Sequence, residues 1–199
     1  MKTKTVLLRG VEIGAGRPKI IVPIVGKTEQ EILDKAAELV QAKPDVVEWR
    51  VDYFQGVGDV QRVVDTAREL NEALGEIPIL FTFRTKREGG EKEIGMEDYT
   101  ALNRAVAQSS YVDAVDVEIF SGDEVVRKNI AAIHAVVSGV NGKVVAQLTA
   151  VLRGVGQRHY TVIGIPLQRL LPAVGHDHLG VGIGRLPHVG AGKHQKRLP

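Results

Sequence analysis

VVEWRVD (residues 46–52) decides the fold class, because apolar and charged side chains alternate along it. Successive side chains of an extended strand point to opposite faces, so Glu48, Arg50 and Asp52 share one face and Trp49 lies on the other. Burying charges costs several kcal/mol per unpaired ion. Such a face is tolerable where the strands of a (β/α)8 barrel end in an active site. The alternative is an edge strand with one face in water.

Four more segments predict strands, and a small hairpin at 5–14 precedes them. The strands are expected at 20–25, 79–84, 114–119 and 143–148. Helical patterns separate them, with a capping box at Thr28–Glu31, a cap at Asp59, a third helix through Tyr99 and a fourth opened by Ser121–Glu124. Repeated βα units of about 30 residues favour a parallel α/β sheet. An open doubly wound sheet competes with a barrel, but the first βα loop has one glycine where a dinucleotide fingerprint needs three.

A second charged segment, ILFTFRTKREGGE (79–91), supports a site at the strand ends. Arg84 is expected to end the strand, and Glu88 lies in the following loop beside Gly89 and Gly90. An arginine at the carboxyl end of a strand suits bidentate capture of a carboxylate or phosphate. Taken alone, this segment is more typical of a solvated basic loop.

Composition predicts a soluble, cytoplasmic protein with a change of character near residue 146. The 199 residues include no Cys, which excludes disulfide scaffolds and thiolate metal sites, and no apolar run long enough to cross a membrane. Residues 146–199 hold seven Lys and Arg but a single acid, Asp177, together with five of the six His. A shift this abrupt is typical of a domain boundary.

Taken together, several motifs resemble the type I 3-dehydroquinate dehydratase family: PKIIVPIVGKT (18–28), EWRVDYF (48–54), ILFTFRTKREGGE (79–91), YTALNRAV (99–106) and VDAVDVEIF (112–120). The resemblance implies a (β/α)8 barrel, a homodimer, and no metal or organic cofactor. It implies dehydration of 3-dehydroquinate to 3-dehydroshikimate in the shikimate pathway, which leads to chorismate and the aromatic amino acids. A lysine forms an imine with the substrate ketone, and a histidine shuttles protons.

The resemblance assigns roles residue by residue. Glu48 would accept a hydrogen bond from a ring hydroxyl, Arg50 would anchor ring oxygens, and Arg84 would bind substrate. Glu88 would orient the catalytic histidine. Trp49 is expected in the core. Four further residues are expected near the site. Asp52 has no firm role, and Pro23 offers only its carbonyl where some members carry Ser. Asp116 and Glu118 are either lining residues or structural ion pairs.

The catalytic pair of the family has no counterpart in the sequence. The histidine is expected near Thr149, but none occurs between His134, which we interpret as an ordinary helix residue, and His159. No lysine occurs between Lys143 and Lys193. A complete barrel needs about 240–250 residues. We therefore expect about five βα units, with the C-terminal part of the barrel missing, and no dehydratase activity.

Two domains are predicted: residues 1–145 as the N-terminal portion of the barrel, and 146–199 as a poorly structured tail. The tail carries no dense basic cluster before 193–197, which argues against a nucleic-acid arm, and His176 with His178 is a weak metal motif. The preferred hypothesis is a coding region read out of frame after about residue 146. The alternative function is a non-catalytic partial barrel that keeps part of a polyhydroxy-carboxylate site; another Schiff-base aldolase fits the motifs less well.

Overall fold

The structure is a computed structural model that describes residues 5–137 and 145–149, with side chains from 5 to 133. Predictions for the tail beyond residue 149, including its lack of structure and the pair His176 and His178, lie outside these residues. The side chain of His134 also lies outside the description, although His134 itself belongs to a helix, as expected.

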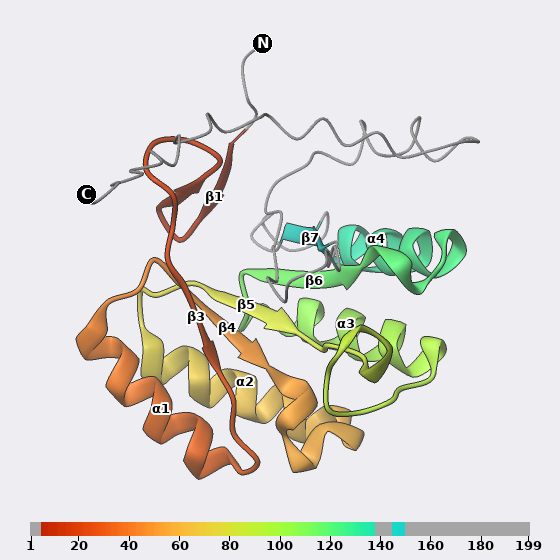
Figure 1. The fold of residues 1–199 in the computed structure, drawn as a ribbon, viewed down its shortest axis with the longest axis horizontal. Coiled ribbons are helices and arrows are strands. Elements are labelled where there is room, and N and C mark those ends of the chain that lie inside the picture. Colours follow the sequence, from red (N-terminus) through yellow and green to blue (C-terminus); the bar gives the residue numbers. More distant parts are fainter. Residues whose placement is uncertain (1–4, 138–144, 150–199) are drawn as a thin grey trace, which may run out of the picture. The chain divides into compact units, whose positions relative to one another are not determined.

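Two sheets form, an antiparallel hairpin and a parallel sheet whose strands follow one another in chain order (Figure 1). The hairpin consists of β1 (Val6–Leu8) and β2 (Val11–Ile13); the parallel sheet consists of β3 (Ile21–Ile24), β4 (Val46–Arg50), β5 (Ile79–Thr82), β6 (Ala114–Glu118) and β7 (Val145–Thr149). All five strands of the parallel sheet were expected from the sequence, and the hairpin was too. The order of neighbours is that of successive βα units.

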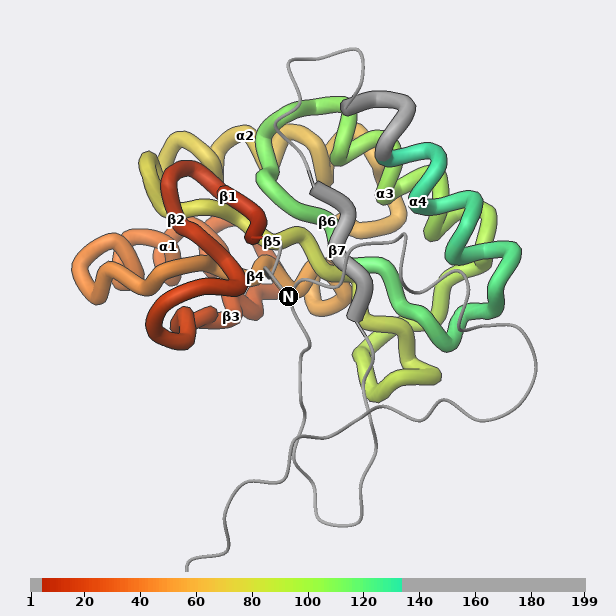
Figure 2. The backbone as a smooth tube through the Cα atoms, turned by 90° about the horizontal axis from the view of Figure 1, so that it is seen from above, coloured from red at the N-terminus to blue at the C-terminus, as the bar shows by residue number. Residues whose placement is uncertain are grey.

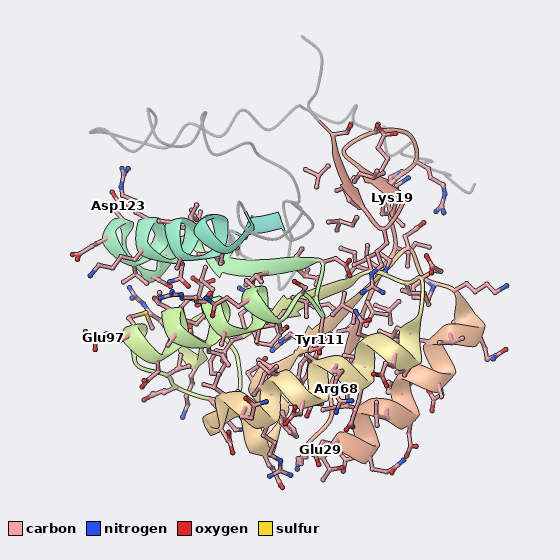
Figure 3. The ribbon with its side chains drawn as sticks, turned by 180° about the vertical axis from the view of Figure 1, so that it is seen from behind. Lys19, Glu29, Arg68, Glu97, Tyr111 and Asp123 are labelled. Atoms are coloured by element: carbon pink, nitrogen blue, oxygen red, sulfur yellow. The ribbon has the colours of Figure 1, made fainter. Side chains whose placement is uncertain are left out.

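Four helices connect the parallel strands and lie in an arc outside them (Figure 2). They are α1 (Glu29–Ala42), α2 (Val60–Leu74), α3 (Met96–Ser109) and α4 (Asp123–Val137). The N-terminal ends of α3 and α4, labelled by Glu97 and Asp123 in Figure 3, lie at the same edge of the helix pair. A single layer of helices around strands in sequential order is the arrangement of the first part of a (β/α)8 barrel.

The predicted helix caps are confirmed at the first two helices. The hydroxyl of Thr28 accepts a hydrogen bond from the Glu31 amide at 3.2 Å, and Asp59 accepts from the amides of Gln61 and Arg62. The fourth start was predicted wrongly at Ser121. That residue ends a short 3₁₀ turn, and α4 begins at Asp123 after a glycine whose φ of 103° redirects the chain.

Two strands end earlier than their sequence patterns predict. β4 stops at Arg50, and residues Val51–Tyr53 form a 3₁₀ turn closed by the Phe54 amide on the Val51 carbonyl at 2.9 Å. Asp52 is therefore not a strand residue, and strand alternation does not place it. β5 stops at Thr82, so Arg84 lies two residues past the strand and does not end it.

The main core lies between the sheet and the helices. Trp49 is fully buried there, with its ring 5.6 Å from Phe81 in an edge-on arrangement and 6.2 Å from Phe54. Its prediction as a core residue is confirmed. The pattern of VVEWRVD thus directs Trp49 and its neighbouring valines to the helices, which leaves Glu48 and Arg50 on the other face of the strand.

The hairpin packs against the N-terminal ends of the parallel strands. Leu8 and Ile13 form a small cluster with three residues near the starts of β4, β5 and β6: Val46, Leu80 and Ala114. Arg9 donates from Nε to Asp113 Oδ1 at 2.8 Å, and Asp113 Oδ2 accepts from the Ile79 amide at 2.8 Å. The hairpin therefore covers the N-terminal ends of the strands, so a ligand site is expected at their carboxyl ends.

Candidate functional site

Arg84 is the centre of a buried group of charges past the carboxyl end of β5. Its side chain is 10% exposed, and Nη2 donates to Asp116 Oδ2 at 3.0 Å. Nη1 donates to Glu118 Oε1 at 3.3 Å and lies 3.6 Å from Glu88 Oε2. The first two carboxylates come from β6 and the third from the loop after β5, so one guanidinium joins two strand ends. Both Asp116 and Glu118 thus form ion pairs.

Thr85 also holds the carboxylate of Glu118, which pairs with Arg84. Its amide donates to Glu118 Oε1 at 2.9 Å, and its hydroxyl donates to Glu118 Oε2 at 2.7 Å. Thr85 is 5% exposed and Glu118 is 1% exposed. Hydrogen bonds between ionised and neutral partners are stronger than neutral ones and tolerate burial when every oxygen has a partner. This arrangement holds the backbone of the β5 loop against β6.

Arg50 and Asp52 form a second buried pair one strand away. The guanidinium donates from Nε and Nη2 to the two oxygens of Asp52, both at 2.8 Å. Burial opposes the charged form of Arg50, but the hydrogen bonds and the charge of Asp52 outweigh it and raise the pKa of Arg50 above its usual value. This bidentate geometry fixes the plane of the guanidinium.

Asp52 also connects the two arginines. It is fully buried and accepts from the Arg84 amide at 3.4 Å and from the Glu91 amide at 3.1 Å. The carboxylate therefore ties the end of β4 to both ends of the loop 84–91. The sequence assigned Asp52 no firm role, and its role here is to hold Arg50 and this loop in place.

Glu48 lies two residues before Arg50 on β4 and is half-buried. It makes no hydrogen bond with a described residue, although its charge reaches Arg50 and contributes to the raised pKa of that guanidinium. The pairing of β3 and β4 places it opposite Pro23, which is exposed. A half-buried carboxylate in this state is suited to accept a hydrogen bond from a ligand.

The loop after β5 is shaped by its two glycines. Gly89 directly follows the 3₁₀ turn Lys86–Glu88. Its φ of 89° lies in the left-handed region, which favours glycine. Gly90 lies so close to Arg84 that a Cβ atom there would stand 1.9 Å from the Arg84 carbonyl oxygen. The pair explains why Glu-Gly-Gly follows the arginine: the first glycine turns the chain and the second lets it return against Arg84.

Lys92 closes this loop. It donates from Nζ to the Phe54 carbonyl, and its own carbonyl accepts from the Lys86 amide at 2.9 Å. Burial lowers the pKa of Lys92, against the opposing charges of Asp52 and Glu91.

A cavity of about 340 Å³ opens beside the loop, between it and the turn after β6. Of the four residues predicted for the site, Glu88 lines this cavity.

The structure thus links Arg50 to the Arg84 backbone through Asp52 and pairs the Arg84 guanidinium with Glu88, with Glu48 two residues before Arg50 on β4. Sequence reasoning missed Thr85 and the need for Gly90. The first has no signal in one sequence, because its partner Glu118 lies 33 positions away. The second could have been found, since two adjacent glycines after a strand indicate a close backbone approach. The described residues include no group of three acidic, His or Cys side chains arranged to hold a metal ion.

The fold and the site define a class of protein: a barrel-type α/β protein with a charged site at the carboxyl ends of its parallel strands. No helix in the described part of the chain is long and apolar enough to span a bilayer. Residues 20–147 match the model of the family "Type I 3-dehydroquinase". The chain belongs to the type I 3-dehydroquinase family.

Individual relatives agree with this assignment. The chain is 48% identical to 3-dehydroquinate dehydratase of Clostridium botulinum over 131 residues, covering 66% of this chain and 52% of that one. The corresponding enzyme of Clostridioides difficile is 45% identical over 134 residues, covering 67% and 52%. The chain thus spans about half the length of the curated relatives it matches.

Solved structures of the family are similar to about three quarters of the chain. Type I 3-dehydroquinate dehydratase from Clostridium difficile has a TM-score of 0.68 and 39% identity, with 74% of this chain and 56% of that one covered. The enzyme from Geobacillus kaustophilus gives 0.65 and 34%, with 73% and 54% covered. The chain thus corresponds to about half of each of these structures.

Proposed function

We propose that this chain carries the substrate-binding half of a 3-dehydroquinate dehydratase site and binds 3-dehydroquinate without dehydrating it. The observation that carries the proposal is that the Arg50 guanidinium, at the end of β4, and the backbone amide of Arg84, two residues past β5, both donate to one buried carboxylate, Asp52. They lie at the carboxyl ends of the strands, where barrel enzymes hold their substrates. We infer the identity of the substrate from the family to which the chain belongs.

Each binding residue has a chemical role in this proposal. Glu48 accepts a hydrogen bond from a hydroxyl of the quinate ring, which a carboxylate with no other hydrogen bond is suited to do. Arg50, oriented by Asp52, donates to ring oxygens. Arg84 contacts the substrate, and Glu88 orients the proton-shuttling histidine of the family.

The charge of this half-site sets the expected strength of binding. Two guanidinium groups face five carboxyl groups, which are Glu48, Asp52, Glu88, Asp116 and Glu118. Four of these carboxylates already pair with the two guanidinium groups, which weakens any ion pair of Arg50 or Arg84 with a substrate carboxylate. Binding therefore rests on the ring hydroxyls and the ketone, and a Kd of about 1 mM or weaker is expected.

Catalysis requires two groups that the printed sequence does not place. Imine formation needs a lysine on a later strand, and proton transfer needs a histidine at the end of the strand that β7 represents. The sequence has no histidine from 135 to 158 and no lysine from 144 to 192. Without an imine there is no electron sink for removal of the proton, so the dehydration step does not proceed.

The two-part organisation belongs to the same proposal. Residues 1–145 form the dehydroquinase portion, and 146–199 are read from a different frame. The family match ends at residue 147, which supports a boundary at this point. Sequencing the coding DNA tests it: another frame beyond codon 146 should encode a histidine-bearing strand motif and a later strand lysine, and their absence from all frames would overturn it.

Replacing Glu48 by glutamine tests the binding role directly. Glu48→Gln keeps the shape but removes the charge that strengthens a hydrogen bond from a ligand hydroxyl, a bond worth about 1.5–3 kcal/mol. The affinity for 3-dehydroquinate, measured by NMR titration of the full chain, should fall about tenfold. Thermal stability should change little, because Glu48 makes no hydrogen bond to a described residue.

The matched control is Glu76→Gln, an exposed carboxylate before β5, at the opposite end of the strands. It should bind 3-dehydroquinate as the unmodified chain does. Equal titration curves for the unmodified chain and Glu48→Gln would show that Glu48 does not bind the substrate. If no NMR signal of the unmodified chain shifts at tens of millimolar substrate, the proposed function is wrong.

A further inference from the structure

Tyr99 lies in the first turns of α3, fully buried, and its hydroxyl contacts the backbone of β6. The hydroxyl donates to the Asp116 carbonyl at 3.2 Å and accepts from the Glu118 amide at 3.2 Å. These backbone groups belong to the two residues whose carboxylates hold Arg84. A side chain from a helix thus occupies hydrogen-bonding positions on a strand.

The register of the sheet shows what these positions would otherwise hold. β5 and β6 pair only at Leu80 with Ala114 and at Phe81 with Val115. A parallel ladder continued by two residues would set Phe83 opposite Val117. The Phe83 amide would then donate to the Asp116 carbonyl, and its carbonyl would accept from the Glu118 amide. The hydroxyl of Tyr99 makes both bonds in its place.

Because the Tyr99 hydroxyl takes the place of the β5 backbone, β5 and β6 are no longer paired at the level of the site. Freed from the ladder, Phe83 packs its ring against that of Tyr99, with centroids 6.2 Å apart at 74°. The next residue, Arg84, then crosses to Asp116 and Glu118. Burial, with the charge of Asp116, raises the pKa of Tyr99, so the hydroxyl keeps its proton at every pH at which the chain is handled.

We propose that Tyr99 is a positioning residue for Arg84: its hydroxyl substitutes for one residue of the neighbouring strand and keeps open the space between β5 and β6 in which the guanidinium lies. This role deepens the proposed function and rests on it only where ligand binding is concerned. Without the hydroxyl, either two buried backbone groups lose their partner, or β5 pairs further along β6 and carries Arg84 away. Both outcomes displace the guanidinium.

Tyr99→Phe tests the proposal by removing one oxygen atom. The readout is the Nε–H signal of Arg84 in a nitrogen-15 NMR spectrum of the full chain, assigned as the arginine signal that Arg84→Lys removes. In Tyr99→Phe this signal should move or broaden, and affinity for 3-dehydroquinate should fall at least fivefold. The control is Tyr111→Phe (Tyr111 is labelled in Figure 3), whose hydroxyl makes no hydrogen bond to a described residue. It should leave the signal and the affinity unchanged.

A lowered melting temperature in Tyr99→Phe with an unmoved Arg84 signal would reduce Tyr99 to a structural role and overturn the proposal. If the variant is too unstable, trimethylamine N-oxide restores the folded population without restoring the hydroxyl, and the same comparison applies. The two proposals also fail differently. Absence of substrate binding by the unmodified chain contradicts the proposed function, whereas the Arg84 signal tests Tyr99 with no ligand present.

Discussion

Replacing Arg84 by methionine should destabilise the chain by about 3–5 kcal/mol at pH 7, the cost typical of breaking a buried ion pair by removing one partner. Methionine preserves much of the side-chain length, so the loss is mainly electrostatic. Asp116 and Glu118, each 1% exposed, would remain near Glu88 without their shared cation. Urea unfolding followed by circular dichroism measures the effect.

The pH dependence of the Arg84→Met variant separates charge from packing. The folded variant, with three acidic groups close together, takes up protons more readily than its unfolded chain does. Its stability relative to the unmodified chain should therefore recover as the pH falls from 7 to 5. The control is Lys86→Met in the same loop, an exposed residue whose loss should cost little. A destabilisation of Arg84→Met that is small, or independent of pH, would contradict the buried cluster.

Replacing Gly90 by alanine should also destabilise the chain strongly. The new methyl group would stand 1.9 Å from the carbonyl oxygen of Arg84 and 2.5 Å from its carbonyl carbon, so backbone must move. Overpacking of this kind costs about 1–3 kcal/mol, and a contact with rigid backbone belongs at the upper end. The movement also breaks the bond from the Gly90 amide to the Thr85 carbonyl, 2.9 Å in the structure. Binding of 3-dehydroquinate should be lost with it.

The control for Gly90→Ala is Gly58→Ala. A Cβ at Gly58 meets no atom within 4 Å, and this glycine has no positive φ. Its substitution should leave the melting temperature within a degree or two of the original, because surface changes without strain have small effects. Equal stability of the two variants would show that the loop 84–91 does not require a glycine at 90.

The sequence predicts the sheet well because its signals are local. The alternation from Val46 to Arg50 and the capping residues Thr28 and Asp59 act over a few positions, and the structure confirms what they indicate. Strand ends were harder to place. The early ends of β4 and β5 depend on a 3₁₀ turn and on contacts with distant residues such as Tyr99, which strand periodicity does not encode.

The candidate site divides along the same line. Residues close in sequence, such as Arg50 and its neighbours on β4, could be placed at a common face from their spacing. The partners of Arg84 on β6 lie more than 30 positions away, so their assignment to ion pairs or to the lining of the site stayed open until the fold was known. Asp52 was the least predictable, because its role depends on backbone amides rather than on residue types.

Borohydride trapping tests most directly the claim that this chain does not form the imine that dehydration of 3-dehydroquinate requires. The purified full chain is incubated with 3-dehydroquinate and sodium borohydride and weighed by mass spectrometry, beside the Clostridioides difficile enzyme as a positive control. The expected result is an unchanged mass for this chain and an adduct on the control, because an imine must form before borohydride can reduce it. An increase equal to reduced substrate or product would show that a lysine of this chain does form the imine, and the catalytic centre would then be present.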